Sequence, residues 1–187
     1  MIWIKKKNLT IKETFALAVQ NHQKNDLQVA ENLYKEVLNA NPNHFGSIFY
    51  LGTLFFQTKR FNSAKSLLQK AIQIKINYAP AHSNLGRALK ELGEYEEAID
   101  HCQKAIQIDP NYSNVYYNLG NILQELRELQ KAKSCYEKLL NLDPTYKKGY
   151  SGYGNLLLKI SQHNKGLAYI RKGDGVIRFT QKDVKII

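Results

Sequence analysis

The side chains that could do catalytic chemistry are few in this sequence and form no catalytic pattern. Five histidines are spread along the chain with no spacing typical of a metal site. The acidic run from Glu94 to Asp100 falls at the start of an expected helix, where carboxylates favour the helix dipole. No phosphate-binding loop, dinucleotide-binding glycine motif, nucleophile elbow or metalloprotease histidine pair occurs. We therefore expect no enzymatic activity, no catalytic residue, no metal and no cofactor.

Amides and cations instead offer chemistry for recognition. Asn84 and Asn118 are 34 residues apart, and an amide can donate to a peptide carbonyl and accept from its N–H group. Arg87 and Lys148 could hold a carboxylate through charge-assisted hydrogen bonds. The sequence thus favours binding of a protein or peptide ligand that could be acidic.

Aromatic side chains are frequent, with twelve tyrosines and seven phenylalanines. Most fall at positions expected to pack in a core, as Tyr34 and Tyr136 do. Phe49, Tyr50 and Tyr117 fall outside the packing positions, where an aromatic ring could offer a ligand a broad apolar contact.

The elements that position these residues follow a period of 34 residues. Residue identities recur at this spacing in three separate series: Leu17, Leu51, Leu85 and Leu119; Ala30, Ala64, Ala98 and Ala132; Gly52, Gly86, Gly120 and Gly154. A fixed period of this length indicates a stack of repeated supersecondary units, each of which contacts its neighbours.

Each unit is expected to be a hairpin of two antiparallel helices. In residues 79–112, apolar and small residues recur at spacings of three and four, which places them on one face of a helix. Gly93 interrupts the first helix, and Pro110 ends the second. Small residues such as Gly86 and Ala98 would let the two helices approach closely.

These motifs resemble the tetratricopeptide repeat family. The family pattern of Leu-Gly, a later Ala and a closing Pro is carried by Leu85-Gly86, Ala98 and Pro110, and by their counterparts in the other units. The resemblance implies an all-α fold, a right-handed α-α superhelix (solenoid). The expected organisation is an N-terminal extension (1–10), four clear repeats (11–44, 45–78, 79–112 and 113–146), a degenerate fifth (147–173) and a tail (174–187) that caps the array or forms a free arm.

The resemblance also implies a concave groove lined by the first helix of each repeat. The candidate peptide-binding residues are polar, cationic or aromatic and are expected on that side: Phe49, Tyr50, Asn84, Arg87, Tyr117, Asn118, Asn121, Lys148 and Asn155. Asn84 and Asn118 resemble the asparagine ladder with which some family members hold a peptide backbone. The ladder has two rungs here, because Ala16, Tyr50 and Gly152 occupy the same position elsewhere. The carboxylate clamp of the chaperone-binding members is incomplete, so binding to a chaperone C-terminus is not expected.

The fifth repeat departs from the pattern. Gly166 and Gly173 replace the small residues of its second helix, which is expected to fray or to end near Gly173. In the tail, Val176, Ile177 and Phe179 are expected to lie on the apolar side of the last hairpin. A tail that leaves the array uncapped could allow self-association.

Composition and charge limit the remaining classes. Of the 187 residues 43 % are hydrophobic, and no apolar run is long enough to span a membrane or serve as a signal peptide, so a cytoplasmic location is expected. Cys102 and Cys135 are expected to be free thiols that act as small hydrophobes. The net charge of +11 is concentrated in residues 45–78 and 147–187, and the acidic third repeat argues against nucleic acid as a partner.

Two functions remain open at this level. The first is a non-catalytic scaffold that binds a peptide or protein segment in the groove. The alternative is an accessory or regulatory arm of a sugar- or sulfate-transferring enzyme system, because tetratricopeptide arrays often accompany such enzymes.

Overall fold

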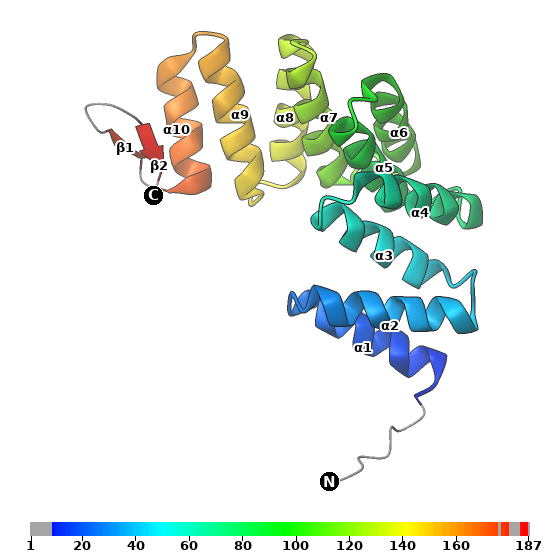
Figure 1. Cartoon of the computed structure of the whole chain (residues 1–187). Helices are drawn as coiled ribbons and strands as arrows, with labels where there is room; N and C mark the ends of the chain where they lie inside the picture. Colours follow the sequence, from blue (N-terminus) through cyan, green and yellow to red (C-terminus); the bar gives the residue numbers. More distant parts are fainter. Residues whose placement is uncertain (1–8, 176, 180–183, 187) are drawn as a thin grey trace. The chain divides into compact units, whose positions relative to one another are not determined.

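The protein is built from ten helices and one short strand pair in the part of the chain that the structure describes. This computed structural model describes residues 9–175, 177–179 and 184–186, the last two segments as backbone alone. The chain divides into two compact units, residues 1–92 and 93–187, and each is described by itself. Figure 1 shows the helices in chain order.

Unit 1 contains five helices that follow the predicted hairpin pattern: α1 (Ile11–Gln23), α2 (Leu27–Ala40), α3 (Phe45–Gln57), α4 (Phe61–Ile74) and α5 (Ala79–Glu91). Helix α1 begins with a capping box, in which the Thr10 hydroxyl accepts from the Glu13 N–H and the Glu13 carboxylate accepts from the Thr10 N–H at 2.9 Å. Each helix packs on the next, and α3 also contacts α1 and α5. The first helix of one repeat therefore lies beside the first helix of the next repeat, as the repeat pattern requires.

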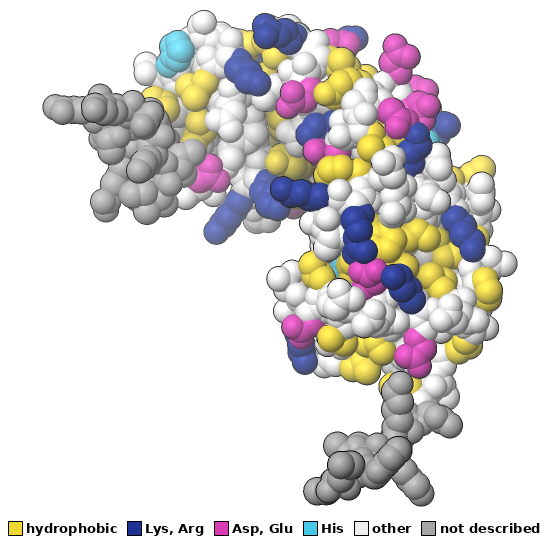
Figure 2. Space-filling view, viewed as in Figure 1, with side chains coloured by type: hydrophobic (Ala, Val, Ile, Leu, Met, Phe, Trp, Pro, Cys, Tyr) yellow, Lys and Arg dark blue, Asp and Glu magenta, His cyan; other side chains and the backbone are white. Residues whose placement is uncertain are grey.

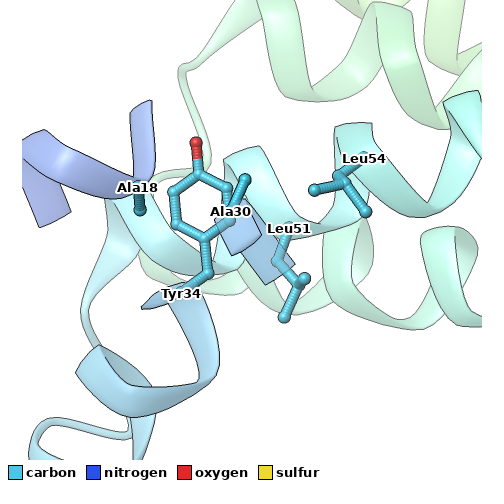
Figure 3. Close-up of a cluster of buried hydrophobic side chains, with 5 residues drawn as sticks. All are labelled: Ala18, Ala30, Tyr34, Leu51 and Leu54. Atoms are coloured by element: carbon cyan, nitrogen blue, oxygen red, sulfur yellow. The ribbon is translucent and has the colours of Figure 1, made fainter. Parts of the chain in front are cut away.

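The core of unit 1 lies between α1, α2 and α3. Its buried side chains are Ala18, Ala30, Tyr34, Leu51 and Leu54. Figure 3 shows the Tyr34 ring rising from α2 between Ala18 and Leu51. Leu51 is 3 % exposed because it packs into this cluster, whereas Leu17, which shares its repeat position, is 38 % exposed. No described helix precedes α1 to cover Leu17, so equal repeat positions do not give equal burial.

Unit 2 contains the other five helices and the strand pair: α6 (Tyr95–Ile108), α7 (Ser113–Glu125), α8 (Leu129–Leu142), α9 (Lys147–Lys159), α10 (His163–Asp174), β1 (Ile177–Phe179) and β2 (Val184–Ile186). The strands are antiparallel, with Ile177 opposite Ile186, and β1 contacts α10. Sequence analysis did not foresee this hairpin. The prediction for the side chains of Val176, Ile177 and Phe179 lies outside the described residues.

The second helix of the fifth repeat ends where the sequence predicted. Helix α10 continues through Gly166 and ends at Asp174, one residue after Gly173. A Cβ at Gly166 would lie 2.9 Å from the Gly154 carbonyl oxygen, and one at Gly173 would lie 2.7 Å from the Lys147 carbonyl oxygen. The glycines therefore allow α9 and α10 to pack backbone against backbone.

Both cysteines of unit 2 are free thiols. Burial raises the pKa of the Cys102 thiol to about 12 and that of the Cys135 thiol to about 11. At neutral pH they are protonated and pack as small apolar groups, as the sequence predicted.

Candidate peptide-binding surface

Unit 1 has a pocket between α1 and α3, the first helices of the first and second repeats. The cavity measures about 250 Å³ and is lined by residues of α1, α2 and α3: Val19, His22, Gln23, Tyr34, Tyr50, Thr53 and Gln57. None of these side chains carries a full charge when the histidine is neutral. The groove face predicted from the repeat pattern therefore has a defined pocket in this unit.

A line of hydrogen bonds fixes the floor of this pocket. The His22 Nδ1 atom lies 3.2 Å from the Tyr34 hydroxyl, and its Nε2 atom lies 3.0 Å from Gln57 Oε1. Since Gln57 Oε1 can only accept, a neutral His22 carries its proton on Nε2 and accepts the Tyr34 hydroxyl proton at Nδ1. Burial raises the pKa of Tyr34, which keeps that hydroxyl protonated. With its oxygen on His22, the Gln57 side chain points its NH₂ group away from that ring.

Aromatic rings form one side of the same pocket. The Tyr34 and Tyr50 rings are stacked, with centroids 6.2 Å apart and planes 6° from parallel, and His22 meets Tyr34 edge-on at 5.9 Å. Tyr50 is 37 % exposed and so presents part of its ring to a ligand. Phe49 is 7 % exposed and packs against Tyr78, with ring centroids 5.2 Å apart, so it offers a ligand little surface.

The predicted polar residues of α5 stand beside this pocket. The Asn84 side-chain NH₂ donates to the Thr53 hydroxyl at 3.2 Å. This bond uses one N–H of the Asn84 amide and does not involve its second N–H or its carbonyl oxygen. The Arg87 guanidinium carbon lies 4.2 Å above the Phe56 ring. Both side chains are half-buried and anchored on α3. Unit 1 thus brings together Tyr50, Asn84 and Arg87 of the candidate site.

Unit 2 gathers the other candidates on α7 and α9. Tyr117 packs against Tyr146, with centroids 5.5 Å apart. Asn121 accepts a 2.6 Å hydrogen bond from the Tyr136 hydroxyl, and Asn118 is only 7 % exposed. Two further candidates are exposed on α9, Lys148 and Asn155.

Sequence analysis missed one feature of both units. Tyr34 and Tyr136 occupy the same repeat position and were assigned to the core alone. Each also turns its hydroxyl onto a polar residue of the first helix of its own repeat, His22 or Asn121. The signal was available, because a buried tyrosine hydroxyl needs a polar partner nearby.

Acidic side chains gather on α6 of unit 2, shown in magenta in Figure 2. Glu96, Glu97 and Asp100 are exposed on this helix. Their charges would repel a phosphate backbone at this helix.

Comparison with known families identifies the repeat. A TPR repeat model matches residues 86–126, a tetratricopeptide repeat model matches residues 113–146, and the model of anaphase-promoting complex, cyclosome, subunit 3 matches residues 20–105. The chain is a tetratricopeptide repeat protein. No curated protein matches the sequence of this tetratricopeptide repeat protein.

Solved structures confirm the fold class, an all-α solenoid of helical hairpins. The protein is similar to the MamA protein at 27 % identity, over 87 % of this chain and 89 % of MamA, with a TM-score of 0.70. It is similar to TTC0263, a thermophilic TPR protein in Thermus thermophilus, at 20 % identity, over 88 % and 90 % of the chains, with a TM-score of 0.80. YrrB, a TPR protein with an unusual peptide-binding site, matches at 18 % identity over 91 % and 88 %, with a TM-score of 0.64.

The described part of this tetratricopeptide repeat protein holds neither a metal site nor a membrane-spanning helix. Within the described residues, no group of His, Cys, Asp or Glu side chains is placed to hold a metal ion. No described helix combines the length and the apolar character needed to cross a bilayer.

Proposed function

We propose that the protein is a non-catalytic scaffold that binds a segment of a partner protein along its first helices. The observation that carries the proposal is the pocket between α1 and α3, with its aromatic wall and its hydrogen-bonded floor. A concave site with a few oriented polar groups is typical of ligand recognition. YrrB is described as having a peptide-binding site, and it shares this fold.

Asparagine side chains would bind the backbone of the ligand, chiefly Asn84 of unit 1. Asn84 has donor and acceptor capacity left after its bond to Thr53. Asn118 occupies the same repeat position in unit 2 but is 7 % exposed, so it would contribute less. A peptide amide needs one donor and one acceptor, which a single side-chain amide supplies.

The test is binding of peptides selected from a random twelve-residue phage library against the full chain. The double variant Asn84→Ala, Asn118→Ala is expected to lose at least about fivefold in affinity by calorimetry, since the lost Asn84 hydrogen bond alone costs about 1 kcal/mol. Asn43→Ala with Asn111→Ala is the matched control, because both asparagines are exposed in turns. Equal affinity of the groove variant and the control would disprove the assignment.

Cations beside these amides would select acidic side chains of the ligand. Arg87 of unit 1 is held over Phe56, and Lys148 of unit 2 is exposed. Replacing either with Gln should weaken binding of acidic peptides more at low salt than at high salt, because salt screens exposed charges. A loss of affinity that is the same at low and high salt would show that these side chains contribute through packing and not through charge.

A further inference from the structure

The groove between α1 and α3 and the groove between α7 and α9 are equivalent in the repeat but differ in chemistry. Helices α1 and α3 of unit 1 and helices α7 and α9 of unit 2 occupy equivalent repeat positions, 102 residues apart. The lining residues of the unit 1 pocket and their counterparts are Val19 and Asn121, His22 and Gln124, Gln23 and Glu125, Tyr50 and Gly152, Thr53 and Asn155, and Gln57 and Lys159.

The unit 2 groove is charged where the unit 1 pocket is neutral. A cavity of about 390 Å³ in unit 2 is lined by Gln124, Glu125, Arg127, Leu129 and Lys159. In unit 1 the positions of Glu125 and Lys159 are held by Gln23 and Gln57. An ionic ligand group could find an opposite charge in the unit 2 cavity, whereas the unit 1 lining supplies none.

The size and the lining of the unit 1 pocket decide what it can hold. At about 250 Å³ it lies below the range of sites for whole small molecules, about 300–1,000 Å³. A charged side chain entering it would lose hydration without gaining a counter-charge. A bulky neutral side chain would instead contact Val19 and the exposed part of the Tyr50 ring, while the Gln57 NH₂ donates to a carbonyl.

We propose that the pocket between α1 and α3 is an anchor site for one uncharged aromatic or branched aliphatic side chain of the bound segment. This inference rests on the proposed function and adds the class of side chain that unit 1 selects. In the Tyr34–His22–Gln57 hydrogen bonds the oxygen of the Gln57 amide lies on His22, which leaves its NH₂ group to contact the ligand.

The capped amides of tryptophan, leucine, lysine and glutamate are suitable probes, titrated into the isotope-labelled full chain. The tryptophan and leucine probes are expected to shift the backbone amide signals of residues 19–23 and 50–57. The lysine and glutamate probes are expected to leave those signals unchanged. Equal shifts from a charged probe, or shifts from the neutral probes only outside these residues, would overturn the inference.

A pair of exchanged residues tests the lining directly. Gln57→Lys gives the unit 1 pocket the residue found at the equivalent position of unit 2. This change should lower the affinity of the tryptophan probe at least about fivefold. Lys159→Gln is the matched control and should leave binding of that probe in unit 1 unchanged. Both positions are exposed, so neither change removes a core contact. Unchanged binding in Gln57→Lys would overturn the inference.

The two proposals fail in different ways. If the phage library yields peptides that lose affinity in the asparagine double variant but carry a charged residue over α1 and α3, the anchor assignment is overturned and the scaffold function stands. If the library yields no binding peptide, the scaffold function itself is overturned.

Discussion

Glu31 is a carboxylate removed from solvent and held by two cations. Its side chain is 8 % exposed, and Arg60 binds it through both guanidinium nitrogens at 3.0 and 2.6 Å. Lys35 adds a contact at 2.7 Å from the next turn of α2. The hydrogen bonds from Arg60 lower the pKa of Glu31 from 4.5 to about 2. The pair ties α2 to the turn before α4.

Glu31→Gln should therefore destabilise unit 1 in a pH-dependent way. A carboxylate with a lowered folded-state pKa stabilises the fold above its unfolded pKa, and this contribution disappears as pH falls from about 4.5 to about 2. We expect a loss of about 2 kcal/mol at pH 7 and little difference near pH 2, measured by urea unfolding. Glu36→Gln, on the exposed side of α2, is the control. A loss that does not change with pH would contradict the ion-pair explanation.

Turns between the two helices of each repeat share one residue in the left-handed conformation. Asn25, Lys59, Gly93, Arg127 and Ser161 all have positive φ, between 59° and 80°, and all occupy the fifteenth position of their repeats. Sequence analysis recognised the turn only at Gly93, because glycine is the residue expected in this conformation. The period, rather than residue type, is the signal that finds the other four.

Lys59→Gly should consequently stabilise unit 1. Relief of the left-handed strain is partly offset by the entropy that glycine loses on folding, so we expect a gain of about 0.5–1 kcal/mol by thermal or urea unfolding. Gly93→Ala makes the opposite change and should lower the free energy of unfolding by about 1 kcal/mol. Its Cβ would meet nothing within 4 Å, so this loss would come from the backbone conformation and not from a steric clash. A Lys59→Gly variant no more stable than the parent would disprove this account.

Helices α9 and α10 form a pair that has no room for a Cβ at their contact. A Cβ at Gly154 would lie 2.7 Å from the Gly166 carbonyl oxygen and 2.8 Å from the Ile170 nitrogen. At the equivalent Gly52, the nearest atom is the Leu68 Cγ, at 3.1 Å. The repeat position is the same, but its neighbours differ: backbone in the fifth repeat and side chain in the second.

Gly154→Ala should accordingly cost more than Gly52→Ala. Backbone cannot move aside as a side chain can, so we expect about 2–3 kcal/mol for Gly154→Ala and about 1 kcal/mol or less for Gly52→Ala. Urea unfolding of the two variants beside the parent is the measurement. Equal losses would mean that α9 and α10 shift apart without cost.

Across the whole molecule, the period predicted the repeat family and the fold class, and the glycine itself predicted the turn at Gly93. It did not predict the exposure of Leu17, because burial depends on which helix lies next to a residue rather than on the residue itself. The strand pair after α10 also escaped prediction, since the tail carries no repeat signal to read.

The candidate site was harder to predict than the fold. Repeat register indicated that Tyr50, Asn84 and Arg87 share one unit, but it also placed Phe49 on the binding side, where the structure packs it against Tyr78. The link from Tyr34 through His22 to Gln57 joins three helices, and spacing along one helix does not report such contacts.

Repeat architecture also predicts how far a local change should spread. Each repeat is stabilised mainly by its neighbours, so Glu31→Gln should raise amide exchange in α1 to α4. Helices α7 to α10 should keep the exchange rates of the parent protein in hydrogen–deuterium exchange. Equal acceleration along the whole chain would show that unfolding is global rather than local.

Tyr34 belongs both to the core of unit 1 and to the floor of its pocket. Natural variation or a designed library therefore cannot change this floor without also weakening the packing around Ala18 and Leu51. Gln23, at the rim of the pocket, is exposed and lies outside this hydrogen-bonded floor, so it carries no such restriction. New binding preferences should consequently evolve through the rim of this pocket, while its floor stays fixed.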